Sequence, residues 1–119
     1  MRFTLALLFV GLLLSACYYD NEDELYPSGC NTNNVSYSLH VEPIVTNNCI
    51  ACHGVVNPLA NITLEGFDNI SKYVLDPNNK LLCAIQHNGC SPMPQPIGKL
   101  SDCSISKIEV WIDNGAPNN

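Results

Sequence analysis

The feature that most constrains this chain is the pentapeptide Cys-Ile-Ala-Cys-His at residues 49–53. It places two thiols three positions apart and an imidazole directly after the second thiol. Side chains three positions apart lie on the same side of a helix, so both sulfurs can meet one bound group. Three kinds of site use such a pattern: a covalently attached haem, a thioredoxin-like dithiol pair and a zinc site.

The haem interpretation accounts for all three functional side chains. Two Cys residues at this spacing present their sulfurs to the two vinyl groups of one porphyrin, and His53 then lies beneath the iron as the proximal ligand. A dithiol redox pair is expected within a βαβ pattern, which the surrounding sequence lacks. Zinc would need the adjacent Cys52 and His53 as joint ligands of one tetrahedral ion, which is an awkward arrangement. We therefore expect one covalent haem, with thioether bonds from Cys49 and Cys52.

Met93 is the expected second axial ligand of the iron. It is the only methionine that remains once Met1 is removed, and it lies in the sequence Ser-Pro-Met-Pro, where the two prolines restrict the loop. A thioether is a soft neutral ligand that raises the reduction potential of haem iron. The alternatives are a methionine that fills a gap in the core, ligation by His87 as the rival ligand and, as the third candidate, ligation by His40.

Residues 1–16 have the pattern of a secretory signal peptide, with one arginine, a short apolar run and small residues. The run is short for a transmembrane helix, and a permanent N-terminal membrane anchor is the alternative. The sequence Leu-Ser-Ala-Cys that ends at Cys17 resembles the lipobox of bacterial lipoproteins. This resemblance implies that Cys17 is the lipidated first residue of a cell-envelope protein, because several acyl chains anchor a protein stably. A soluble secreted protein with a free Cys17 is the other possibility.

The charge of the mature chain argues against nucleic acid as a partner. Removing Arg2 from the five cationic residues leaves four lysines against eleven acidic residues, a formal charge of −7. Phosphate binding needs lysine and arginine. An acidic protein instead favours a redox partner that has a basic docking patch.

The rest of the chain divides into a tether and one domain. Residues 17–29 hold four acids in five positions, followed by Pro27 and Gly29, which is typical of a solvated spacer. Residues 30–119 are expected to form one small domain, whose length supports only a modest core.

The clearest predicted helix lies near the end of the chain. Ser101 can act as its N-cap and Gly115 as the residue that follows its C-cap. Between them one apolar stripe has helical spacing: Ile105, Ile108, Trp111 and Ile112.

A second helix is predicted over residues 41–48, with Pro43 in its first turn, where a missing N–H costs little. Residues 35–41 also alternate apolar and polar side chains, so an extended segment is the alternative there.

Two further helices are predicted between these. The first covers about 69–75 and is capped by Asp68. The second covers about 80–87 and is capped by Asn78 or Asn79.

Together, these segments resemble the class I cytochrome c domain. The residues that carry the resemblance are the motif at 49–53, Met-Pro at 93–94, Lys-Leu-Ser at 99–101 and Trp-Ile-Asp-Asn-Gly-Ala-Pro at 111–117. It implies an all-α fold in which a helix before the haem motif crosses the C-terminal helix and a Met-Pro loop closes the distal side. The lipobox and acidic tether make the chain most similar to small outer-envelope lipoprotein cytochromes.

The resemblance also implies a function. With His53 and Met93 on the iron, no position is open for substrate, so a membrane-tethered electron carrier is expected rather than an enzyme. The alternative is a haem-containing module of a periplasmic redox enzyme with a labile distal ligand, in which His87 could assist with protons. A gas or redox sensor would also need a weak sixth ligand.

Four cysteines remain beyond the haem and lipid sites, which is a departure from most domains of this family. They allow three pairings, and two disulfides are expected in an oxidising compartment. We expect Cys30–Cys103, because the family fold brings the start of the domain near the start of the last helix. We also expect Cys83–Cys90, which would brace the loop before Met93.

Overall fold

The computed structural model describes residues 29–119. The expected signal peptide, the lipid site at Cys17 and the tether up to residue 28 lie outside the described residues. The described part is helical and contains no strand, which confirms the all-α class. None of its helices has the length and apolar character needed to cross a membrane. The elements in chain order are η1 (Tyr37–Val41), α3 (Glu42–Asn48), α4 (Ile50–His53), η2 (Leu59–Asn61), α5 (Phe67–Val74), α6 (Leu81–Ile85) and α7 (Asp102–Asp113).

The first helix begins earlier than the apolar spacing predicts. Ser36 is extended, with φ −112° and ψ 154°, and its Oγ accepts a hydrogen bond from the Leu39 backbone N–H. One π-helical turn, η1, then runs directly into α3, whose first turn contains Pro43 as predicted. The alternative of an extended segment over 35–41 is therefore wrong from Tyr37 onward, because the Ser36 cap starts the helix there.

The start of α5 differs from the prediction. Gly66, at φ 82°, precedes the first helical residue, and no side chain caps the helix. Asp68 therefore lies inside the first turn rather than at the cap, where its carboxylate still suits the positive end of the helix dipole. The left-handed backbone at Gly66 lets the chain turn into the helix two residues sooner than Asp68 alone predicts.

The helix α6 is shorter than the predicted 80–87. Asn79 Oδ1 accepts a hydrogen bond from the Leu81 N–H at 3.3 Å, so Asn79 contributes to the start as predicted. The helix ends at Ile85 because His87 adopts a left-handed conformation, with φ 57°, two residues before Gly89.

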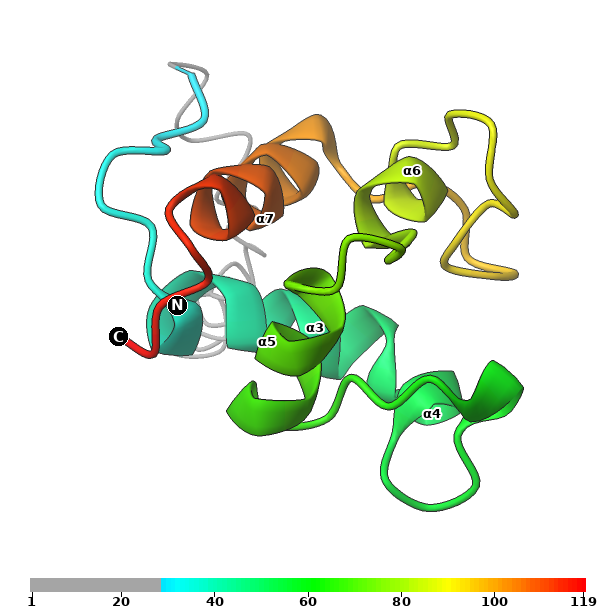
Figure 1. Cartoon of the computed structure of the whole chain (residues 1–119). Helices are drawn as coiled ribbons and strands as arrows, with labels where there is room; N and C mark the ends of the chain where they lie inside the picture. The colour runs from blue at the N-terminus through cyan, green and yellow to red at the C-terminus, as the bar shows by residue number, and fades with distance from the viewer. Residues whose placement is uncertain (1–28) are drawn as a thin grey trace, which may run out of the picture.

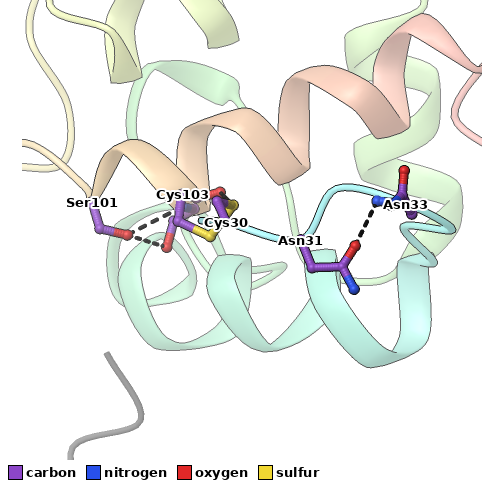
Figure 2. The surroundings of a disulfide bond; sticks show 6 residues. Cys30, Asn31, Asn33, Ser101 and Cys103 are labelled. Carbon is purple, nitrogen blue, oxygen red and sulfur yellow. Dashed lines mark hydrogen bonds between the residues drawn. A yellow bond between two sulfur atoms is a disulfide. The ribbon is translucent and has the colours of Figure 1, made fainter. Parts of the chain in front are cut away.

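Both predicted ends of α7 are present. Ser101 Oγ accepts a hydrogen bond from the Ser104 N–H at 3.1 Å, and Figure 2 shows Ser101 beside the disulfide. Gly115, at φ 86°, turns the chain back, and the Ala116 N–H donates to the Trp111 carbonyl at 2.9 Å. This is a Schellman-type ending, which needs the left-handed residue that glycine supplies.

Trp111 lies at the centre of the core and is fully buried. Its indole N–H donates to the Pro117 carbonyl at 2.9 Å, and its ring lies 5.6 Å from that of Tyr37. The Tyr37 ring in turn meets Phe67 edge-on at 5.2 Å. These contacts pack α7 against η1, and Tyr37 connects η1 to the first residue of α5 (Figure 1). The buried core residues are Val35, Tyr37, Val41, Val45, Leu64, Ile70, Val74, Leu81, Ile85, Leu100, Ile105, Ile108, Trp111 and Ala116.

The described part of the chain contains two disulfides, and both have the expected pairing. Cys30 joins Cys103, with Cα atoms 5.2 Å apart, so the start of the domain is tied to the first turn of α7 (Figure 2). Cys83 joins Cys90, with Cα atoms 5.5 Å apart, across the turn that follows α6.

Removing the long-range disulfide should destabilise the domain more than removing the short one. Cross-links restrict the unfolded chain more when they enclose a longer loop, and the two bonds span 73 and 7 residues. The double variant Cys30→Ser, Cys103→Ser should lose about 2–5 kcal/mol of unfolding free energy, measured by chemical denaturation. The matched control is Cys83→Ser, Cys90→Ser, and an equal or larger loss in this control would contradict the expectation.

Candidate functional site

An apolar cavity of about 680 Å³ lies between two parts of the chain. The α4 helix and the η2 segment line one side, and α6 with the loop at residues 93–96 lines the other, while Tyr73 of α5 also contributes. In Figure 1, α4 is seen below and α6 with its following loop above. A cavity of this size and apolar character suits a small molecule or a cofactor.

The four side chains predicted from the sequence all line this cavity: Cys49, Cys52, His53 and Met93. The first three come from one helical turn around α4, and Met93 comes from the loop after α6. Cys49, His53 and Met93 are partly buried, whereas Cys52 is exposed. The fold therefore brings two thiols, an imidazole and a thioether from distant segments to the wall of one cavity.

The His53 ring is oriented by a backbone carbonyl. Its Nδ1 lies 3.0 Å from the Ile62 oxygen, and the Leu64 N–H donates to the His53 carbonyl at 2.8 Å. Because a carbonyl can only accept, Nδ1 carries the hydrogen, and the neutral ring keeps a free lone pair on Nε2. Metal-bound histidines have this arrangement, with the second nitrogen donating to an oxygen.

Gly54 allows the chain to leave α4 at a sharp angle. A Cβ at this position would lie 2.9 Å from the Ile50 carbonyl and 3.2 Å from Glu65 Oε2. The same carboxylate oxygen accepts a hydrogen bond from the Val55 N–H at 2.8 Å. The turn after the motif therefore depends on a close approach that only glycine permits, and apart from the glycine itself no sequence pattern predicts this turn.

The backbone of Met93 is held on both sides. Its N–H donates to the Ala84 carbonyl at 3.1 Å, and its carbonyl accepts from His87 Nε2 at 3.0 Å. Both partners belong to α6 and the turn that follows it.

Neither rival histidine lines the cavity. His87 uses its Nε2–H for the Met93 carbonyl, and His40 accepts a hydrogen bond from the Ser36 N–H at 3.1 Å through Nδ1, at the start of η1. Among the described histidines and the described methionine, His53 and Met93 are thus the two that reach the cavity.

Several lining residues were not identified from the sequence. Leu81, Ala84 and Ile85 of α6 line the cavity at i, i+3 and i+4, a spacing that could have predicted an apolar face. Tyr73 and Lys80 also line it, and Lys80 is the only lysine, arginine, aspartate or glutamate among its described lining residues. The Ile62 carbonyl could not be predicted, because it is a backbone atom placed by the path of the loop.

Burial keeps the Cys49 thiol protonated. Loss of solvent, with a smaller contribution from the nearby Cys52, raises the pKa of the Cys49 thiol to about 11. Cys49 and Cys52 are unpaired in the structure. No group of three or more His, Cys, Asp or Glu residues within 29–119 is placed to hold a metal ion, so the donor set of a closed zinc site is not assembled there.

Comparison with models of protein families, with curated proteins and with solved structures finds no match to this chain.

The two motif thiols should differ in reactivity when both are free. The thiolate is the nucleophile, so a thiol whose pKa is raised to about 11 reacts slowly at pH 8 and faster as the pH approaches that value. We expect an alkylating reagent to label the exposed Cys52 first at pH 8, and the labelling of Cys49 to increase steeply between pH 8 and 11.

Mass spectrometry of the single variants Cys49→Ser and Cys52→Ser separates the two labelling rates. Equal rates at pH 8, or a Cys49 rate that does not change with pH, would contradict the expectation.

Proposed function

We propose that this chain is a mono-haem c-type cytochrome that carries electrons while a lipid on Cys17 holds it at a membrane of the cell envelope. Cys49 and Cys52 would bind one haem through thioether bonds, and His53 and Met93 would be its axial ligands. The observation that carries the proposal is the apolar cavity whose wall contains all four of these side chains.

The chemistry of the lining residues fits a haem. A porphyrin is flat and largely apolar. The α6 side chains on one wall of the cavity are also apolar and can pack against it. His53 offers a free nitrogen, and Met93 offers a soft neutral sulfur. Lys80 supplies a positive charge that can meet a propionate carboxylate.

The state of the cysteines also fits attachment. A thioether forms when a thiol adds across a vinyl double bond, the sulfur bonding to one carbon and the hydrogen going to the other, so no oxidant is needed. Cys49 and Cys52 are unpaired, whereas the other four described cysteines form disulfides.

When bound, haem supplies one-electron chemistry through the ferrous and ferric states of its iron. Backbone carbonyls hold both residues that would bind the iron, His53 through the Ile62 carbonyl and Met93 through the Ala84 carbonyl. Ligands fixed in this way need little rearrangement when charge changes. With both axial positions filled no substrate position is open, so the proposal is an electron carrier and not an enzyme.

The partner would be another redox protein with a basic docking patch. Seven acidic residues lie within the described part of the chain, and none of them lines the cavity: Glu42, Glu65, Asp68, Asp76, Asp102, Glu109 and Asp113. Their charge would attract a basic partner over distance and raise the rate of encounter. Cys52 is exposed at the cavity wall, which is where the partner would approach the haem.

Optical spectra of the haem-loaded protein test the proposal, with and without carbon monoxide. Wild type should give low-spin spectra, the weak red band expected of Met–Fe(III) ligation, and no rapid binding of carbon monoxide. Met93→Ala removes the thioether, so this variant should lose the band, bind carbon monoxide and have a lower reduction potential.

The matched control is His40→Ala, which removes a side chain that does not line the cavity and should behave as wild type. High-spin spectra and rapid carbon monoxide binding in wild type would contradict the electron-carrier proposal. They would favour instead a module of a redox enzyme with a labile distal ligand.

Lipidation predicts where the protein is found after cell fractionation. Cys17→Ser removes the acceptor of the lipid, so the variant should leave the membrane fraction while its haem spectrum stays unchanged. The mass of the wild-type protein from the membrane fraction identifies the anchor, and a mass that still includes residues 1–16 would show that they act as a permanent anchor.

A further inference from the structure

We infer that His87 is a positioning residue for the distal ligand, whose imidazole holds the Met93 carbonyl and so keeps the thioether directed at the haem iron. This inference rests on the proposed function. It gives His87 a role other than the two considered from the sequence, iron ligation and proton transfer.

The loop at residues 91–98 is held by few polar contacts. Among the described residues, its backbone takes part in only two hydrogen bonds, and both are made by Met93. The Ala84 carbonyl accepts from the Met93 N–H at 3.1 Å, and His87 Nε2–H donates to the Met93 carbonyl at 3.0 Å. Fixing the N–H and the carbonyl of one residue fixes the peptide planes on both sides of its Cα, and hence the direction of its Cα–Cβ bond, from which the side chain starts.

The turn that carries His87 is itself braced. The His87 N–H donates to the Ala84 carbonyl at 3.2 Å, and the Asn88 N–H donates to the Cys83 carbonyl at 3.0 Å. The Cys83–Cys90 disulfide closes the same turn. The imidazole therefore extends from a fixed backbone, so that its hydrogen bond restrains the loop rather than moving with it.

The hydrogen bond also defines the role of the ring. A carbonyl cannot donate, so Nε2 carries the hydrogen and has no lone pair available for iron in this arrangement. The His87 side chain is exposed and does not line the cavity. Removing it would therefore remove a hydrogen bond without opening the core.

Three substitutions separate the hydrogen bond from the backbone conformation. His87 has a φ of 57°, which is strained for alanine and glutamine and more easily adopted by asparagine. His87→Ala lacks a donor, His87→Gln carries an amide N–H with a reach similar to that of Nε2, and His87→Asn suits the backbone but is too short to reach Met93.

The experiment uses the haem-loaded full chain and measures three quantities: the rate of carbon monoxide binding to the ferrous protein, the Met–Fe(III) band, and thermal unfolding. A typical hydrogen bond predicts about a two- to tenfold faster carbon monoxide reaction in His87→Ala and His87→Asn. His87→Gln should restore most of the wild-type rate and band. The control His40→Ala loses a histidine far from the cavity and should react as wild type.

The outcomes distinguish this inference from the proposed function. A wild type without the Met–Fe(III) band overturns both. A wild type with the band, combined with His87→Ala at the wild-type rate, overturns only the positioning role. Equal effects of alanine and glutamine, or a normal rate in His87→Asn, would assign the effect to the turn conformation and would also overturn it.

Discussion

The apolar cavity between α4 and α6 connects the core of the domain to the candidate site. Leu81 and Ile85 belong to the core and also line this cavity, so the core and the site share one wall. Fully burying one Leu or Ile side chain is worth roughly 1.5–3 kcal/mol, while the whole stability of a domain is about 5–15 kcal/mol. Haem bound in the cavity of about 680 Å³, as we propose, would therefore add a large share of the stability of so small a domain.

The rest of the molecule holds the two walls of this cavity in place. Trp111 fixes α7 against η1 through Tyr37, and Cys30–Cys103 ties the beginning of the domain to the same helix. At the wall formed by α6, the Cys83–Cys90 disulfide closes the turn that leads into the loop containing Met93. Rigid elements thus carry side chains whose positions have to be kept within a narrow range, as a preorganised site requires.

The sequence predicted the parts of the structure whose causes are local. Ser101 and Gly115 define the ends of α7 through their own side chain and backbone preferences, and the motif at 49–53 is contained in one helical turn. The start of α5 and the end of α6 are predicted less accurately, because Gly66 decides the first and the left-handed conformation of His87 decides the second. The apolar spacing of these segments does not mark either residue as a helix boundary. The acceptors of His53 and Met93 could not be predicted, because they are backbone carbonyls placed by tertiary structure.

The central claim is that haem is bonded to the motif at 49–53, and peptide mass analysis tests it most directly. The protein would be produced together with the haem-attachment machinery, then denatured, reduced, alkylated and cut with trypsin. Because no lysine or arginine lies between residues 30 and 71, one fragment that ends at Lys72 contains the motif. With haem attached as proposed, this fragment would carry the mass of one haem in addition to the lipid on Cys17, with Cys49 and Cys52 protected from alkylation and the four disulfide cysteines of the chain alkylated. A fragment that lacks the mass of haem, with both motif cysteines alkylated, would contradict the proposal.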